Sequence, residues 1–328
     1  MTPYKLWIKT GDLVARHLMV IVPLGVAVGI LFPQALLPLK PCVPAFFAIM
    51  TFQSSLSNDL GAMGYALRRP LALVVTILLV HLVLPSVTYL ISSLIFGFGS
   101  PTVAGVVLEY SVPIGASSVM WVGMFSGEIA LGLSALLVST MLSPFTIPAT
   151  MKLLVGASVE IDAMGMMTNM AFMVALPALL ATVFNEVTRG WAKKTLTPVT
   201  TPFSRLLLPL IVATNATGIS EPMRHLTPVL VGIMLLMLLF AIGSFMAGML
   251  VARLLSRGDR ARFVAISFSC GIRNVTAGAV LASQYFGPEV MYPAIIATPF
   301  QQVLAAGFGR IMERMLADGS SLDDSVLL

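Results

Sequence analysis

The amino-acid sequence predicts an all-α polytopic membrane protein whose ten transmembrane helices form two inverted five-helix repeats, with helices 4 and 9 discontinuous. Three observations indicate this fold class: an apolar composition, a one-sided distribution of basic residues, and two interrupted apolar segments. Of the 328 residues, 58% are hydrophobic and 10% are charged, and the mean hydropathy is +0.96. This composition leaves too little polar surface to cover a water-soluble globule of this size, so it excludes a large soluble core.

Ten apolar segments, separated by charges, proline or glycine, are long enough to be membrane spans. They cover residues 15–32, 41–57, 70–96, 101–125, 128–156, 161–186, 203–219, 226–254, 261–285 and 290–315. The first contains Pro23 and Gly25 and is too long for a cleaved signal peptide, so it is taken as the first span. Residues 317–328 are acidic and rich in small side chains, which predicts a disordered cytoplasmic tail.

The basic residues test this count, because cytoplasmic loops of membrane proteins carry an excess of lysine and arginine. With the N-terminus inside the cell, fifteen of the 19 basic residues lie on the cytoplasmic side. Lys40, Lys152 and Arg224 lie outside, and Arg273 is left in the membrane. The asymmetry predicts an even number of spans, with both termini in the cytoplasm, in a bacterial inner membrane. The charges orient the chain in a lipid bilayer, so a nucleic-acid partner is not expected.

The ten spans divide into two groups of five, and the longest polar connection, Asn185–Pro202, follows the first span of the second group. Because five is odd, the second group starts on the opposite side of the membrane from the first, which is the arrangement of an inverted repeat. We expect an N-terminal repeat over residues 1–158 and a C-terminal repeat over residues 159–316. The sequence sets no oligomeric state.

The fourth span of each group is interrupted near its middle. Segment 101–125 is broken at Pro113 and Gly115, and segment 261–285 is broken at Gly271. Unwound backbone at membrane depth is tolerated where it is buried in protein or lines a cavity, and paired broken spans point to the binding site of a carrier. We therefore expect free backbone amides and carbonyls at the breaks to bind a ligand. The polar side chains beside them are Ser117, Ser118, Ser269, Asn274 and Thr276.

Glu109 and Arg273 are the ionisable residues, apart from histidine, that lie well inside the predicted spans. A charge at the bilayer centre costs about 2.5–3.5 kcal/mol on insertion scales, so each needs a partner or a wet cavity. One interpretation is a structural ion pair. The other is that Arg273 binds an anionic substrate or replaces a coupling cation. His81 is interpreted as a packed residue or an inter-helix hydrogen-bonding residue rather than a proton relay.

Enzymatic chemistry has no visible motif in this sequence. It contains no nucleotide-binding loop, no zinc-protease helix and no nucleophile elbow. Cys42 and Cys270 have no metal-ligand spacing around them, so neither a disulfide framework nor a metal site is expected. The chain is therefore predicted to be a transporter without a cofactor.

Four stretches resemble the bile acid:sodium symporter family, within a superfamily that includes arsenite and auxin-type efflux carriers. They are Gly105-Val-Val-Leu with Pro113-Ile-Gly-Ala-Ser-Ser118, Gly127-Glu-Ile-Ala-Leu131, Val138-Ser-Thr-Met-Leu-Ser-Pro-Phe-Thr-Ile-Pro-Ala149, and Gly271-Ile-Arg-Asn274. The resemblance implies a panel domain of spans 1, 2, 6 and 7, and a core domain of spans 3–5 and 8–10 in which the broken spans cross. Members of the family mostly move organic anions inward with sodium.

The sequence departs from the family where sodium would be held. Ser269 occupies the position of the family's glutamate, Arg273 that of its glutamine, and Val119 that of its span-four asparagine. Gly132 and Leu136 occupy hydroxyl positions of span five. A residual sodium site would have Ser118 and Ser269, so we expect Arg273 to stand in for sodium, with Glu109 as its counter-charge.

The sequence thus predicts a secondary carrier of a small organic anion, with Na⁺ or H⁺ left open as the coupling ion. An efflux carrier for an oxyanion or another toxic compound is the alternative within transport, and it would use the thiol of Cys270. A membrane-embedded sensor or enzyme is the alternative from another class.

Overall fold

The computed structural model describes residues 3–58, 61, 64, 70–156, 161–224 and 227–317. Within these residues every regular element is a helix. The first half contains α1 (Pro3–Arg16), α2 (Leu18–Leu31), α3 (Pro33–Leu36), α4 (Val43–Ser55), α6 (Pro70–Leu78), α7 (Leu84–Phe96), α8 (Pro101–Ser111), α9 (Ser117–Met124) and α10 (Ile129–Leu154). The second half contains α11 (Ala163–Met170), α12 (Leu176–Val187), α13 (Thr197–Ala216), α14 (Ser220–Arg224), α15 (Pro228–Ser256), α16 (Arg260–Gly271), α17 (Val275–Tyr285), α18 (Pro288–Ile296) and α19 (Thr298–Ala317).

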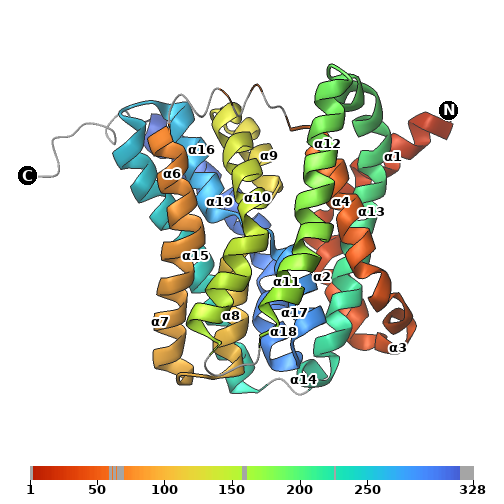
Figure 1. Ribbon diagram of the computed structural model, residues 1–328, viewed down its shortest axis with the longest axis vertical. Coiled ribbons are helices and arrows are strands. Elements are labelled where there is room, and N and C mark those ends of the chain that lie inside the picture. Colours follow the sequence, from red (N-terminus) through yellow and green to blue (C-terminus); the bar gives the residue numbers. More distant parts are fainter. Residues whose placement is uncertain are drawn as a thin grey trace, which may run out of the picture.

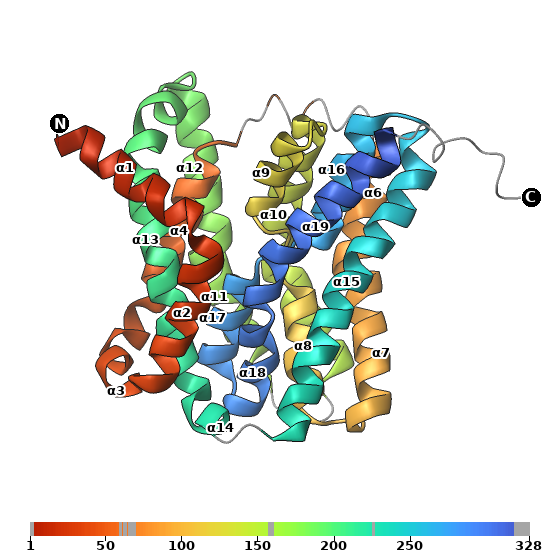
Figure 2. The same ribbon diagram turned by 180° about the vertical axis from the view of Figure 1, so that it is seen from behind.

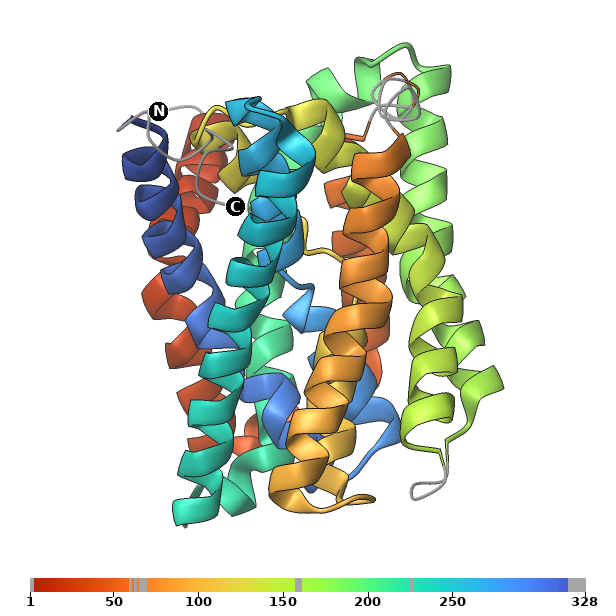
Figure 3. The same cartoon turned by 90° about the vertical axis from the view of Figure 1, so that its left-hand side faces the viewer.

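Shorter helical turns join several of these helices. The 3₁₀ turns are η1 (Leu37–Cys42) and η5 (Thr217–Ile219), and the π-helical turns are η2 (Leu79–Val83), η3 (Ala171–Ala175) and η4 (Ala192–Leu196). Because η2 links α6 directly to α7, these elements form one helix that crosses the molecule from end to end beside α15 (Figure 3).

Six helical segments among the described residues are long and apolar enough to cross a membrane, and a seventh counts if α1 and α2, bent by 82°, form one span. The six are Pro33–Ser55, Pro70–Phe96, Ile129–Leu154, Ala163–Val187, Ala192–Ile219 and Pro228–Ser256. They match six of the predicted spans. The predicted spans 41–57 and 203–219 were too short at their N-terminal ends, since helix continues through flanking proline and polar residues.

The connection between the two spans is much shorter than the expected Asn185–Pro202, because most of these residues are helical. A turn of residues 188–190 separates α12 from the helix that follows. The amide of Gly190, which has a positive φ of 80°, donates to the carbonyl of Asn185 at 2.8 Å. The Asn185 side chain in turn accepts from the Lys193 amide at 3.1 Å. Polarity suggested a loop, but lysine is a good helix former and these side chains are exposed on the helix.

The helices form two groups that lie side by side (Figures 1 and 2). One group contains α1–α4, α12 and α13, and the other contains α6–α10, α15, α16 and α19. The start of α1 and the end of α19 lie at the same end of the molecule. The predicted tail from residue 318 and the loop with Arg68 and Arg69 lie outside the described residues.

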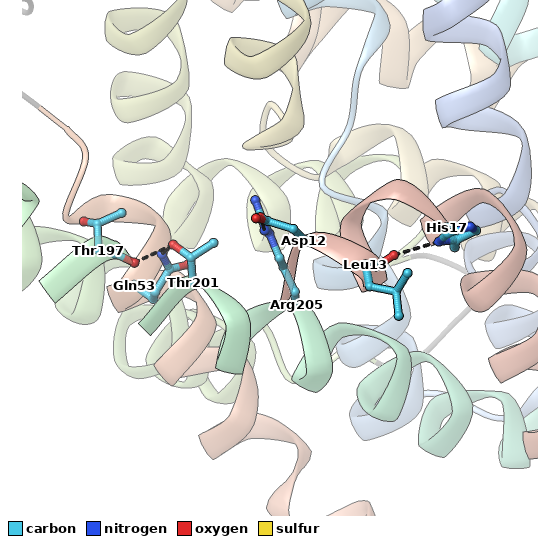
Figure 4. Close-up of polar contacts among 7 residues, drawn as sticks. All are labelled: Asp12, Leu13, His17, Gln53, Thr197, Thr201 and Arg205. Atoms are coloured by element: carbon cyan, nitrogen blue, oxygen red, sulfur yellow. Dashed lines mark hydrogen bonds and ion pairs between the residues drawn. The ribbon is translucent and has the colours of Figure 1, made fainter. Parts of the chain in front are cut away.

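Polar side chains join the helices of the first group at the end where α1 lies (Figure 4). Asp12 of α1 accepts from Arg205 of α13 at 2.7 Å. Gln53 of α4 donates to the hydroxyl of Thr201 on α13 at 2.8 Å, and that hydroxyl donates to the Thr197 carbonyl at 2.6 Å. Gln53 therefore fixes α4 against α13.

The broken helices occupy the most buried part of the molecule. Residues 103–111 of α8, 263–271 of α16 and 276–283 of α17 are all buried. A helix that is buried on all sides carries no polar face, which is why these segments show no amphipathic period. The tenth predicted span also proves to be two helices, α18 and α19, which meet at Ala297.

Candidate functional site

The two breaks cross one another in the interior. Between α8 and α9, and between α16 and α17, the chain is extended for a few residues, and Ile114 and Arg273 form an antiparallel β-bridge there. The Gly115 amide donates to the Ile272 carbonyl at 3.0 Å, and the Asn274 amide donates to the Pro113 carbonyl at 2.8 Å. The expectation that the two broken spans meet is confirmed.

We expected the backbone amides and carbonyls at the breaks to be free for a ligand, but four of them are paired with each other. They are the amides of Gly115 and Asn274 and the carbonyls of Ile272 and Pro113. Buried amides and carbonyls need partners, and each break supplies them to the other. Gly115 permits this close approach, since a Cβ at that position would lie 2.6 Å from the Arg273 carbonyl oxygen. Recognition of a ligand here therefore depends mainly on side chains.

A chain of hydrogen bonds from α10 and η2 supports the first break. The Ile114 amide donates to the Ser139 hydroxyl at 2.9 Å, and Ser139 lies 2.7 Å from His81 Nε2. On the other side of the ring, His81 Nδ1 lies 3.0 Å from the Thr146 hydroxyl, which itself donates to the Leu142 carbonyl. A neutral imidazole with its proton on Nδ1 satisfies every one of these contacts. The interpretation of His81 as an inter-helix hydrogen-bonding residue is confirmed.

Replacing Ser139 by Ala should destabilise the protein more than replacing Ser143 by Ala. Both serines are completely buried on α10, but Ser143 bonds only to the Thr140 carbonyl of its own helix. Loss of Ser139 leaves the Ile114 amide and His81 Nε2 without partners, at about 1–3 kcal/mol for each buried group. Thermal unfolding in detergent measures the difference, and equal losses for the two variants would contradict this role.

Two adjacent glutamines of α19 hold the crossing from the opposite side. Gln301 donates to the Arg273 carbonyl at 2.6 Å. Gln302 donates to the Ser117 hydroxyl at 3.2 Å and accepts from the Trp121 indole at 2.9 Å. The sequence interpretation missed both residues. Two consecutive amide side chains inside the apolar segment 290–315 are the signal that could have found them.

A small buried cavity lies beside the crossing, between α8, α15, α19 and the second break. It has about 20 Å³ of space for water and is lined in part by Glu109, Tyr110, Ser244, Arg273 and Gln301. The Arg273 guanidinium lies 6.0 Å from the centre of the Tyr110 ring, and its Nη1 donates to the Val112 carbonyl at 3.4 Å. Glu109 and Arg273 share this cavity without forming an ion pair. Of the two interpretations of these residues, the structural ion pair is therefore not formed in this structure.

The remaining predicted site residues lie at or beside the two breaks. Asn274 begins α17, where its side chain accepts from the Ala277 amide at 3.2 Å, and Gly271 packs against the Phe245 ring. Ser118 and Ser269 are buried, and their hydroxyls have no hydrogen-bond partner among the described residues. Ser117 is half-buried and Thr276 is buried. Two unpartnered hydroxyls are what the structure offers at the residual sodium site.

The thiol that an efflux carrier would use lies near the end of α16, directly before the second break. Cys270 is completely buried against α15, where a Cβ at Gly248 would lie 2.6 Å from the cysteine Cβ. It therefore packs between α15 and α16.

Comparison with known proteins places this chain in a family. Residues 44–222 match the model of the Sodium Bile acid symporter family. The chain is 33% identical to the uncharacterized protein YbaS of Bacillus subtilis over 89% of its own length and 95% of that protein. It is 27% identical to the probable sodium/metabolite cotransporter BASS1, chloroplastic, of Oryza sativa subsp. japonica, over 93% of this chain and 75% of that protein. A protein of Arabidopsis thaliana with the same description is 24% identical over 94% of this chain and 76% of its own length.

These matches agree with the long apolar helices of the fold. The chain is an integral membrane protein and belongs to the Sodium Bile acid symporter family of transporters.

Proposed function

We propose that this protein is a secondary active transporter of a small organic anion. The observation that carries the proposal is the buried Arg273, whose Nε and Nη2 groups have no partner among the described residues although they lie at the crossing of two broken helices. A guanidinium in such a position recognises a carboxylate through charge-assisted hydrogen bonds. The family and the two cotransporter relatives support transport as the activity.

The proposed architecture has ten spans in two inverted repeats, residues 1–158 and 159–316. Three of these spans are broken helices: α8 with α9, α16 with α17, and α18 with α19. The other seven are the six long segments and the bent pair of α1 and α2. The panel domain corresponds to the group around α2, α4, α12 and α13, and the core domain to the group that holds the crossing. Alternating access would follow from movement of one group against the other around the crossing.

The distribution of basic residues supports the proposal that both ends of the chain lie in the cytoplasm. Fifteen basic residues lie on the side of the termini in this topology, against three on the other side. The start of α1 and the end of α19 lie at one end of the molecule, which supports termini on one side of the membrane. The Bacillus relative supports a bacterial cytoplasmic membrane.

The fixed charge of Arg273 is proposed to replace sodium. Two unit charges 4 Å apart repel by about 4 kcal/mol at an effective dielectric constant of 20, so a sodium ion beside this guanidinium would bind weakly. The site also offers only two unpartnered hydroxyls, those of Ser118 and Ser269, among the residues considered for sodium. The relatives named as sodium/metabolite cotransporters would then differ from this protein in their coupling ion.

Transport by the purified protein should not require sodium. Proteoliposomes would be supplied with ¹⁴C-labelled lactate, succinate, citrate or gluconate, with either sodium or potassium as the external cation. We expect uptake of at least one carboxylate above that of protein-free liposomes, at the same initial rate with both cations. Steep dependence on sodium would contradict the role of Arg273, and absence of uptake or exchange for all four compounds would contradict a carrier of small carboxylates.

A further inference from the structure

Unpartnered polar atoms converge on the cavity beside the crossing. Both carboxylate oxygens of Glu109, the Nε and Nη2 groups of Arg273 and the side-chain oxygen of Gln301 have no hydrogen-bond partner among the described residues. All three side chains line the cavity, and their exposed fractions are 1%, 5% and 6%. A polar cavity with an unsatisfied carboxylate indicates a site for a ligand that satisfies it.

The size of the cavity limits that ligand. A water molecule needs roughly 10–15 Å³ of such space and two to four polar partners, and the cavity has about 20 Å³. An organic anion does not fit there in this conformation. The occupants that fit are a water molecule and a proton on the carboxylate itself.

Glu109 is the carboxyl group that lines this cavity, and a carboxyl group takes up and releases a proton when water reaches it. Tyr110 and Arg273 are the other ionisable residues that line it; a phenol ordinarily titrates near pH 10, and a guanidinium stays protonated. On α15 the Ser244 hydroxyl is already bonded to the Ala241 carbonyl, and on α19 Gln301 is uncharged. Cys270, which precedes the second break, is buried against α15.

Glu109 is also in contact with the helix that follows the second break. Its Oε2 atom lies against Gly278 of α17, where a Cβ would collide with it. The carboxylate is therefore held between α8 and α17 and faces the Arg273 cavity. A change in its charge alters the electrostatic balance at the crossing, because the carboxylate and the Arg273 guanidinium belong to residues that line the same cavity.

We propose that Glu109 is the proton-binding site of the transport cycle. The carboxylate takes one proton from water when the site faces one side of the membrane and returns it to water on the other side, and in the ionised state it shares a water molecule with Arg273. This inference rests on the proposed function and names its coupling ion. It assigns the proton to Glu109 and leaves the anion to Arg273.

Infrared difference spectroscopy of the lipid-reconstituted protein tests the proton site without any substrate. Spectra at acidic and alkaline pH should show the carbonyl stretch of a buried carboxylic acid that Glu109→Gln lacks. The matched control is Glu289→Gln, because Glu289 is exposed in the first turn of α18; it should keep the signal. A signal that Glu109→Gln retains, or no such signal in the unaltered protein, would overturn the proposal.

Transport supplies the second test, with the four labelled carboxylates named above. An inward proton gradient should drive accumulation by the unaltered protein and by Glu289→Gln, whereas Glu109→Gln should lose accumulation yet keep exchange of labelled for unlabelled carboxylate. Gradient-driven accumulation by Glu109→Gln would overturn proton coupling at this residue. Because the variant could fail to fold, acidification of the lumen during uptake by the unaltered protein is measured with a trapped pH dye, and its absence would also overturn the proposal. If none of the four compounds is transported, the proposed function fails while the infrared result still decides the proton site.

Discussion

Arg273→Gln is expected to abolish anion uptake and to lower the free energy of unfolding at alkaline pH by about 3–5 kcal/mol, the usual cost of a buried charge left without compensation. The guanidinium is the positive group that lines the cavity, and without it an ionised Glu109 has no counter-charge there. The variant also loses the bond from Nη1 to the Val112 carbonyl. Stability should be lost progressively as the pH rises, because a protonated Glu109 needs no counter-charge.

The double variant Glu109→Gln with Arg273→Gln separates stability from recognition. Removing both charges should restore most of the thermal stability, since no isolated charge remains buried. It should not restore uptake, because the group proposed to bind the anion is still absent. Thermal unfolding and proteoliposome uptake measure the two properties. An Arg273→Gln protein that unfolds like the unaltered one and still transports would show that neither role belongs to Arg273.

Gly115→Ala is expected to open the crossing of the two breaks and to stop transport. The added methyl group would lie 2.6 Å from the Arg273 carbonyl oxygen and 3.0 Å from its carbonyl carbon, and this backbone cannot move aside as a flexible side chain does. The amide of residue 115 would then be pulled away from the Ile272 carbonyl. Overpacking of this kind typically costs about 1–3 kcal/mol, and loss of a hydrogen bond adds about 1 kcal/mol.

Gly123→Ala is the matched control, because it lies on α9 of the same broken segment. A Cβ there would meet only the Ile129 Cδ1 atom, at an ordinary contact distance of 3.8 Å. Alanine also favours a helix over glycine by about 0.5–1 kcal/mol, so this variant should be as stable as the unaltered protein or slightly more stable. Unfolding temperature and carboxylate uptake are measured for both variants, and unchanged transport by Gly115→Ala would show that the close approach is not required.

The sequence was sufficient to predict the helical class, the two breaks and the buried charged residues. Hydropathy reports the long helices directly, and Pro113 and Gly271 interrupt otherwise apolar segments. The helical course of residues 191–202 could not be read in this way, because lysine and threonine suggest a loop by polarity while their backbone forms a helix. Boundaries at the ends of spans are set by backbone bonds that polarity does not report.

The partners at the site could not be predicted either. Pairing between the breaks joins residues about 160 positions apart, such as Val112 and Arg273, and contacts of this kind leave no local period in a sequence. An ion pair between Glu109 and Arg273 was one of two interpretations, yet the two residues face a cavity that only the packing of α8, α15 and α19 creates. The bonds of Gln301 and Gln302 depend on that packing in the same way.

The mutual pairing of the breaks has a consequence for biosynthesis. The ribosome completes residues 112–116 long before residues 271–274, so the newly inserted first half enters the lipid with the Pro113 carbonyl and the Gly115 amide still unpaired. Until the later segment arrives, water or the insertion machinery must satisfy these groups. Separately expressed halves should therefore be degraded when alone and accumulate when produced together, because each half carries hydrogen-bond partners that the other lacks.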